Sequence, residues 1–223
     1  MELLEEGPVS PSSISTVVLS HIHFDHVGDP NRFPSAVMLA GPGSKDVSGV
    51  GWPRDPRSPF LSSVTEHPHY QELSFETDAW ALWGPFARAY DFFGDGSFYL
   101  VDTPGHLPGH MGGVALTGVD EWVVMGGDCC HHRSLLMHTR PMSVTCGPAG
   151  PTGFHLDPDS AKKTVGTIRK LEKESKGSVL VALAHDSYLR GRMPEYPKPL
   201  NGFQTSEWKK DLDRVLQKDY ASV

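Results

Sequence analysis

Short apolar, β-branched runs recur along this chain, and a polar turn follows almost every one of them. The runs cover residues 15–20, 36–40, 98–101, 113–117, 122–125 and 179–184. Apolar runs of this length, bounded by Gly, Pro, Asn, Asp or Ser, are typical of short buried strands. The pattern therefore predicts a chain built on several short strands.

Helical periodicity is confined to a few places. Residues 1–7 indicate the last turns of an amphipathic helix. Asp157 and Pro158 predict the start of a longer helix, because Asp caps a helix N-terminus and Pro is tolerated in the first turn. We expect Gly177 to end this helix, whose inward stripe is Ala161, Val165, Ile168 and Leu171. A last helix is expected from about Ser206, with one apolar face formed by Trp208, Leu212, Val215 and Leu216.

Residues 41–96 interrupt this alternation. Gly, Pro, Ser and charged residues predominate from 41 to 59, a composition that disfavours both a long helix and a central strand. Aromatic residues are frequent after that, from Phe60 to Phe93. We expect a single domain spanning residues 1–223, with an aromatic-rich insertion at about 41–96 that could cover a pocket. The alternative is that these aromatic side chains only pack the insertion against the body of the domain.

Composition narrows the class of protein. The chain has 223 residues, with 27 acidic against 20 basic residues and a formal charge of -7, so a nucleic-acid surface built on bulk positive charge is disfavoured. The adjacent Cys129 and Cys130, with Cys146 as an ordinary partly buried thiol, cannot form a conventional disulfide framework. No apolar run approaches the roughly 20 residues of a membrane helix. The acidic first residues do not resemble a signal peptide. We expect a soluble cytoplasmic protein without membrane contact.

Candidate chemistry first appears directly after the strand at 15–20. His21, His23, Asp25 and His26 place three imidazoles and a carboxylate within six residues. Each would need a polar partner if buried, and a metal ion would satisfy all of them. In an extended chain His21 and His23 point the same way, while Asp25 and His26 can reach a second point in space. Imidazole and carboxylate without thiolate suit Zn²⁺ first, and Mn²⁺ or Fe²⁺ as alternatives. The competing interpretation is a histidine-rich surface loop.

Further polar clusters follow three other predicted strands. They are residues 102–110 after the strand at 98–101, residues 126–132 after the strand at 122–125, and His185-Asp186 after the strand at 179–184. This recurrence at strand ends is the strongest organisational signal in the sequence, and it predicts that the clusters form one site.

These clusters resemble the metallo-β-lactamase superfamily, in the branch that contains N-acyl-homoserine lactonases and related lactone and amide hydrolases. The His-x-His-x-Asp-His signature is met by His21, His23, Asp25 and His26. Thr103 to His110 match the Thr-Pro-Gly-His-x-x-Gly-His segment, Asp128 matches the bridging aspartate, and His185 matches the closing histidine. The resemblance implies an α/β (α+β) fold, an αβ/βα sandwich of two mixed β-sheets flanked by helices.

The resemblance also implies a binuclear site. One divalent ion would be bound by His21, His23 and His110, and the other by Asp25, His26 and His185, with Asp128 bridging them. His106 would be a loop residue or an outer partner of a ligand. We leave His67, His69, His138 and His155 as surface or loop residues, and expect Cys129 and Cys130 to be packing residues beside the site.

By the same resemblance, a hydroxide between the metals would attack the carbonyl of a small cyclic ester or amide, a lactone or lactam. Asp25 or Asp128 could pass the proton to the leaving atom. The lactonases have a tyrosine three residues after the bridging aspartate, and here that position is His131. An imidazole N–H can donate the same hydrogen bond to the substrate, with a pH dependence near neutrality.

Only 20 residues precede the histidine signature, whereas the superfamily places most of its first sheet there. We therefore expect an N-terminally shortened first sheet, whose exposed edge a homo-oligomer could cover. A second hypothesis is a shortened, weakly active or inactive form that binds metal or a partner without turnover. A third, an RNA-processing nuclease of the same superfamily, is disfavoured by the acidic balance.

Overall fold

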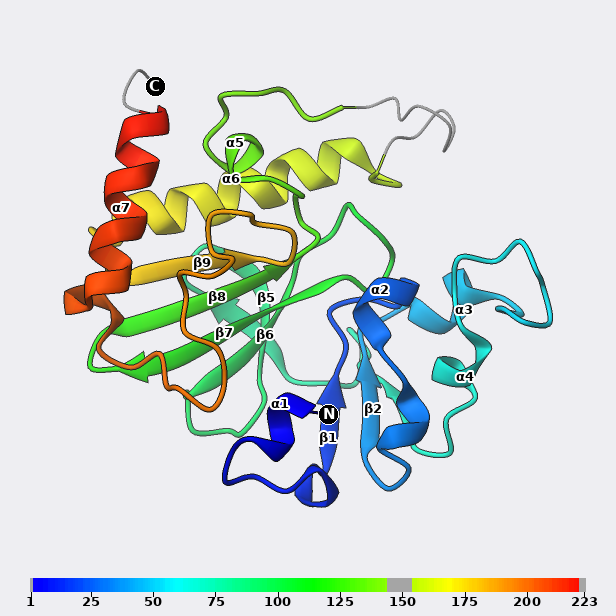
Figure 1. Cartoon of the computed structure of the whole chain (residues 1–223). Helices are drawn as coiled ribbons and strands as arrows, with labels where there is room; N and C mark the ends of the chain where they lie inside the picture. Colours follow the sequence, from blue (N-terminus) through cyan, green and yellow to red (C-terminus); the bar gives the residue numbers. More distant parts are fainter. Residues whose placement is uncertain (1, 144–153, 221–223) are drawn as a thin grey trace.

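The computed structural model describes residues 2–143 and 154–220, so Cys146 lies outside the described residues. Within these ranges the chain forms two β-sheets with helices packed on them (Figure 1). The smaller sheet has the order β1-β2-β3 and is parallel; its strands are Thr16–Val18, Val37–Ala40 and Tyr70–Glu72. This two-sheet α/β architecture confirms the expected fold class.

The larger sheet has the order β4-β5-β6-β7-β8-β9. Its strands are Trp80–Trp83, Phe86–Asp91, Phe98–Asp102, Met111–Gly118, Glu121–Gly127 and Val179–Leu183. Neighbouring strands are antiparallel except β8 and β9, which are parallel. A parallel pair needs a crossover connection, and the long helix α6 (Pro158–Glu174) lies in that connection. Each apolar run predicted to be a strand is a strand.

The segment at 41–96 corrects the sequence-based expectation of a covering insertion. It contributes β3 to the smaller sheet and β4 and β5 to the larger one, with two short helices between, α3 (Ser44–Ser48) and α4 (Ser62–Thr65). The Trp83 ring packs against Tyr99 and Trp122, with ring centroids 5.4 and 5.0 Å apart. Aromatic side chains of this segment therefore pack on the sheet itself, which is the alternative that the sequence left open.

Helix α6 covers one face of the larger sheet (Figure 1). The Asp157 side chain accepts a hydrogen bond of 3.0 Å from the Ser160 N–H and so caps the helix start, as predicted. The inward stripe Ala161, Val165 and Ile168 is buried. Val165 and Ile168 pack in a core cluster with Val101, Val114, Val124 and Val181 of the sheet. Apolar burial on this face joins four strands to one helix.

The opposite face of the larger sheet is covered by two other parts of the chain. Leu100 and Met111 pack with Leu39 of the smaller sheet. Val123 and Leu180 pack instead with Leu212 of the last helix, α7 (Glu207–Tyr220), and with Phe203 of a short 3-10 helix, η3 (Phe203–Thr205). Because adjacent strand residues point to opposite faces, α6 and α7 lie on opposite sides of this sheet.

The remaining helical elements are short. They are α1 (Glu2–Glu5), η1 (Pro11–Ser13), α2 (Phe24–Val27), η2 (Pro30–Arg32) and α5 (Arg133–Leu136). Among the described residues, no helix combines the length and the apolar character that crossing a membrane would require.

Candidate metal centre

The polar clusters at the strand ends come together, as the sequence predicts. A backbone hydrogen bond of 2.8 Å from Met111 N–H to the Ser20 carbonyl joins the end of β1 to the start of β7, and so connects the two sheets beside the site. The loops that follow β1, β6, β8 and β9 therefore meet at one edge of the sandwich.

Local structure directs the first cluster to two points in space. His21 and His23 flank the buried Ile22 in extended chain after β1. The His23 backbone forms a bridge with Phe60, and the two rings stack with centroids 5.4 Å apart. The chain then turns into α2, which carries Asp25 and His26. The change from extended to helical backbone gives the second pair of side chains a direction different from that of the first.

One group of donors consists of His21, His23 and His106. The Nδ1 atom of His23 lies 2.9 Å from Nε2 of His21 and 3.0 Å from Nε2 of His106. A ring nitrogen can either donate or accept one hydrogen bond in the ring plane, so His23 Nδ1 cannot satisfy both neighbours well. A cation can, because a ligand distance of about 2.1 Å places imidazole nitrogens at comparable separations around zinc. The donors present therefore fit a metal ion.

The second group consists of Asp25, His26 and His185. Nε2 of His26 lies 3.3 Å from Nε2 of His185. Asp25 Oδ2 lies 3.6 Å from His26 Nε2 and 3.8 Å from His185 Nε2. This group is more open than the first, since the side chains of Asp25 and His185 are 43% and 41% exposed. It also fits a metal ion, with one carboxylate and two imidazoles.

The buried carboxylate of Asp128 lies between the two groups. Its Oδ2 atom is 3.6 Å from His106 Nε2 on one side and 3.3 Å from His26 Nε2 on the other. Its Oδ1 atom is buried without a hydrogen-bond partner and lies 3.3 Å from His185 Nε2. The Asp128 carboxylate thus has one oxygen close to nitrogen donors of both groups and a second, buried oxygen without a hydrogen-bond partner, an arrangement that could serve two cations.

His110 is where the structure departs from the sequence prediction. Its Nε2 atom accepts a hydrogen bond of 3.0 Å from the Asp128 backbone N–H, and its Nδ1 atom lies 2.7 Å from Thr103 Oγ1 and 3.0 Å from the Thr103 carbonyl. Both ring nitrogens are thus engaged by protein. His106 takes the place with His21 and His23 that the sequence assigned to His110.

The position of each histidine in the loop between β6 and β7 explains why His106, and not His110, lies with His21 and His23. His110 directly precedes β7, where its backbone carbonyl accepts a hydrogen bond from the Thr103 N–H. It is therefore fixed within the sheet, whereas His106 lies in the turn that reaches the cluster. Gly127 permits the contact on the other side, because a Cβ atom there would lie 2.9 Å from His110 Nε2. The position of His106 in mid-turn was the only sequence signal that could have identified it.

Two further histidines, His131 and His155, pack against residues of the donor groups. Nε2 of His131 lies 3.1 Å from Asp128 Oδ2, and the His131 ring stacks on His185 with centroids 5.4 Å apart. His155, expected to be a surface or loop residue, lies in the loop before α6 but is only 1% exposed, and its ring packs against His106 and His131. His67, for which the same expectation was made, lies in the loop between α4 and β3 and is also buried. His69 and His138 are exposed.

The adjacent thiols are not part of the centre. Cys129 and Cys130 are buried in the core cluster beneath α6, and neither belongs to a group of potential metal ligands among the described residues. They are packing residues in this structure, as the sequence suggests.

Electrostatics favour ligands ready to bind a cation. Burial, with His110 nearby, lowers the pKa of His106 to about 2. Burial also holds the pKa of His21 far below its usual range, so both imidazoles are neutral at neutral pH. For Asp128, burial would raise the pKa, but hydrogen bonds with His131 and His26 outweigh it and the pKa lies well below the ordinary range. Neutral imidazole and ionised carboxylate are the forms that bind metals.

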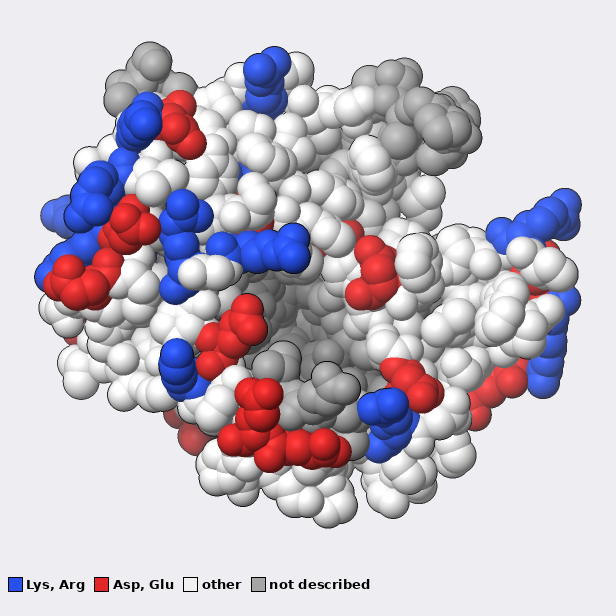
Figure 2. Space-filling view, viewed as in Figure 1, with Lys and Arg blue, Asp and Glu red and all other residues white. Residues whose placement is uncertain are grey.

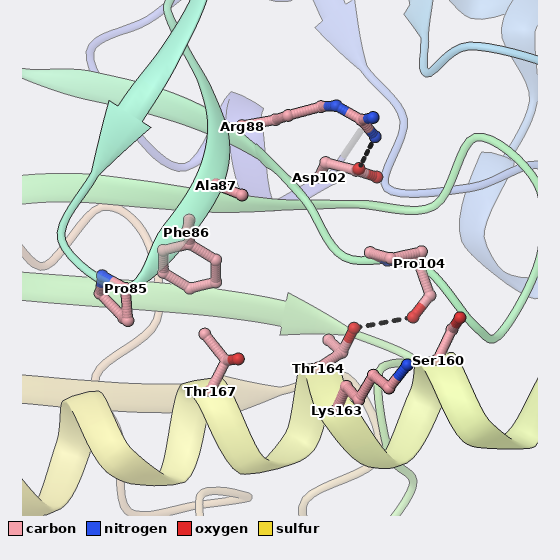
Figure 3. Close-up of a pocket in the computed structure, with 10 residues that line it drawn as sticks. All are labelled: Pro85, Phe86, Ala87, Arg88, Asp102, Pro104, Ser160, Lys163, Thr164 and Thr167. Carbon is pink, nitrogen blue, oxygen red and sulfur yellow. Dashed lines mark hydrogen bonds and ion pairs between the residues drawn. The ribbon is translucent and has the colours of Figure 1, made fainter.

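Two cavities differ in their relation to this centre. One, of about 330 Å³, lies between Val18 of β1 and the inner face of the larger sheet, and His26 lines it. The other, of about 400 Å³, lies between β5, β6 and α6, where Arg88 binds Asp102 and Thr164 binds the Pro104 carbonyl (Figure 3). None of the cluster residues lines the second cavity.

Comparisons with known proteins find related sequences that cover nearly the whole of this chain. The chain is 37% identical over 241 residues to the metallo-hydrolase mfmC of Annulohypoxylon moriforme, covering 95% of this chain and 63% of that protein. It is 30% identical over 245 residues to the gamma-lactamase FDB1 of Fusarium pseudograminearum, covering 94% of this chain and 59% of that protein. The chain thus spans less than two thirds of the length of either relative.

The fold has close counterparts among solved structures. An N-acyl homoserine lactone hydrolase with the product N-hexanoyl-L-homoserine at its catalytic metal center has a TM-score of 0.63 at 18% identity. The similarity covers 88% of this chain and 66% of that one. The family model described as the metallo-beta-lactamase superfamily matches residues 2–127, which is more than half of the chain. With the two sheets and the convergent histidine and aspartate groups, this match shows that the chain belongs to the metallo-beta-lactamase superfamily.

Proposed function

We propose that this chain is a metal-dependent hydrolase that opens small cyclic esters or amides, with two divalent ions as cofactors. The observation that carries the proposal is the placement of the Asp128 carboxylate between two groups of donors, within 3.6 Å of His106 on one side and 3.3 Å of His26 on the other. Zinc is the first choice, because the ligands are imidazoles and carboxylates in small groups.

The proposed ligand sets follow the geometry. His21, His23 and His106 would hold one ion, Asp25, His26 and His185 the other, and Asp128 both. When bound, such a pair of ions supplies a water of lowered pKa and polarises a carbonyl. No nucleophilic side chain is required for this chemistry.

The chain's own residues provide the remaining functions. Asp25 has a partly exposed carboxylate beside His26, so it can receive a proton and pass it to the leaving oxygen or nitrogen. Asp128 can do the same from the buried side. The His131 side chain is 24% exposed and its Nε2 atom faces Asp128, so an N–H at the other ring nitrogen, Nδ1, would be the group offered to a substrate carbonyl.

The substrate class rests on two features. The relative named gamma-lactamase FDB1 shares 30% identity with nearly the whole of this chain. The cavity of about 330 Å³ that reaches His26 is lined largely by apolar side chains and glycines, among them Val18, Leu100 and Met125. A pocket of this size suits a small molecule with an apolar part.

Surface charge does not favour a polyanionic substrate. Lysines and arginines gather over α7, where acidic residues are interspersed, and both acidic and basic side chains border the central hollow on the face shown in Figure 2, without a continuous basic surface. A nuclease would need a basic surface leading to the metal centre.

Metal analysis combined with a substrate panel tests the proposal. The purified protein should retain two divalent ions per chain and hydrolyse members of a panel of γ- and δ-lactones and lactams, while a linear ester, a linear amide and single-stranded RNA serve as comparison substrates. Chelation should abolish turnover and zinc should restore it. Metal binding without hydrolysis would support the alternative of a metal-binding form without turnover. Light scattering of the same sample tests the expected homo-oligomer.

A further inference from the structure

A buried histidine that the proposed reaction does not use lies directly beside a proposed metal ligand. His155 is 1% exposed, and its ring makes an edge-on contact with His106, with centroids 5.3 Å apart and planes at 78°. Its Nδ1 atom is buried and has no hydrogen-bond partner. A buried unpaired ring nitrogen loses its hydrogen bonds to water without replacement, so such a group calls for a physical explanation.

His106 also has a buried ring nitrogen without a hydrogen-bond partner, and this nitrogen would be a donor. Its Nε2 atom faces His23 and Asp128, at 3.0 and 3.6 Å, and is the atom that would bind a metal. Its Nδ1 atom must then carry the proton, yet this atom is also buried without a partner. Histidine ligands almost always donate this second N–H to an acceptor, which fixes the tautomer and the ring orientation.

Backbone hydrogen bonds hold the two histidines side by side. The Leu156 N–H donates to the His106 carbonyl at 3.1 Å, and the Asp157 N–H donates to the Gly105 carbonyl at 2.9 Å. These bonds attach the residues just before α6 to the loop that carries His106. Gly105 allows the close approach, since a Cβ atom there would lie 2.2 Å from the backbone nitrogen of Ala161. The backbone that follows His155 is thus held against the loop of His106 by protein hydrogen bonds alone.

We propose that His155 is a positioning residue for the proposed metal ligand His106: its Nδ1 atom accepts a hydrogen bond that His106 Nδ1–H relays through one bridging water molecule. Each histidine supplies what the other lacks, one a donor and the other an acceptor. The inference rests on the proposed metal centre, because His106 Nδ1 must be a donor only when Nε2 binds a cation. His155 orients His106 and has no contact with the substrate in this role.

Cobalt(II) titration of the metal-free protein tests the inference without any substrate. His155→Phe keeps an aromatic ring but removes the acceptor, whereas His155→Gln keeps an acceptor oxygen. We expect His155→Phe to weaken cobalt binding by about 10–100-fold, as loss of an outer partner of a metal ligand does, and to change the visible absorption of the bound cobalt. His155→Gln should recover most of the affinity and the wild-type spectrum.

His67→Phe is the matched control, because His67 is also a buried histidine with an unpartnered ring nitrogen but belongs to no group of potential ligands. Its cobalt affinity and spectrum should equal those of the wild type. His155→Leu replaces His155→Phe if the latter does not fold. Wild-type affinity and spectrum in a folded acceptor-free variant would overturn the inference, and so would a loss that His155→Gln does not recover. A wild-type protein that binds no cobalt would instead overturn the proposed function.

Discussion

The backbone N–H of Asp128 donates a hydrogen bond of 3.0 Å to Nε2 of His110. This bond joins the end of β8 to the start of β7, and it fixes the backbone that carries the Asp128 carboxylate. His110 is therefore part of the framework that positions Asp128, while His106, four residues earlier, presents its Nε2 atom to the cluster. The two histidines of one motif thus lie in different environments, and we propose different functions for them.

Replacing each of these histidines should separate the two functions. His106→Ala should lose at least one equivalent of metal and most of the turnover, because it removes a proposed ligand. His110→Ala should retain metal but lower the free energy of unfolding by about 1–3 kcal/mol, because it leaves the buried Asp128 N–H without an acceptor. Metal-to-protein ratios after dialysis and urea denaturation measure the two effects. Loss of metal in the His110 variant with retention in the His106 variant would restore the sequence-based assignment.

Asp128→Asn should weaken metal binding at both donor groups. The substitution preserves the shape of the side chain but removes the negative charge that both donor groups share. We expect affinity for at least one ion to fall by about 100-fold or more, since loss of an outer partner alone costs 10–100-fold. Asp102→Asn is a suitable control, because Asp102 pairs with Arg88 in the cavity that contains no cluster residue. Its metal content should equal that of the wild type, and equal metal content in the Asp128 variant would contradict a bridging role.

The stability of the metal-free protein should fall on acidification. Burial lowers the pKa of His110 from 6.5 to about 4. On acidification, the unfolded chain therefore becomes protonated at this histidine at a higher pH than the folded chain does. The contribution is fully present above pH 6.5 and is lost as pH falls towards 4. It amounts to a few kcal/mol at most. Urea denaturation with a chelator, from pH 7.5 downwards, should give a shallower pH dependence for His110→Gln than for the wild type. Parallel curves would show that His110 does not contribute.

A buried ion pair should stabilise the helical layer over β9. Arg133 of α5 pairs with Glu172 of α6 and donates to the Val181 carbonyl at 3.4 Å, and the side chains are only 7% and 19% exposed. Burial raises the pKa of Glu172, and the positive charge of Arg133 partly offsets this increase. Arg133→Met should cost about 3–5 kcal/mol, because it leaves a buried carboxylate unpaired, and adding Glu172→Leu should recover much of it. Chemical denaturation measures the free energy of unfolding of the single and double variants. An equal loss of stability in both would show that lost packing of the Arg133 side chain, and not the unpaired charge, is the cause.

Local pattern was sufficient for much of the fold. The apolar runs that end at Ser20 and Ala184 form β1 and β9, and Asp157 caps α6, because strand and helix signals extend over only a few residues. Six of the seven predicted metal ligands also lie in the two donor groups or bridge them. They are close in sequence or follow strands whose ends share one edge of the sandwich.

Strand order and side-chain direction depended on contacts between distant parts of the chain. Residues 41–96 contain three strands, of which β3 pairs with β2, β4 with β5, and β5 with β6; composition alone does not indicate such pairing and so suggested an insertion. The choice of His106 over His110 depends on a hydrogen bond to Asp128, and the burial of His155 depends on the docking of α6 against the loop at Gly105. The sequence determined which residue types could bind metal, and tertiary packing decided which ring nitrogens were free to do so.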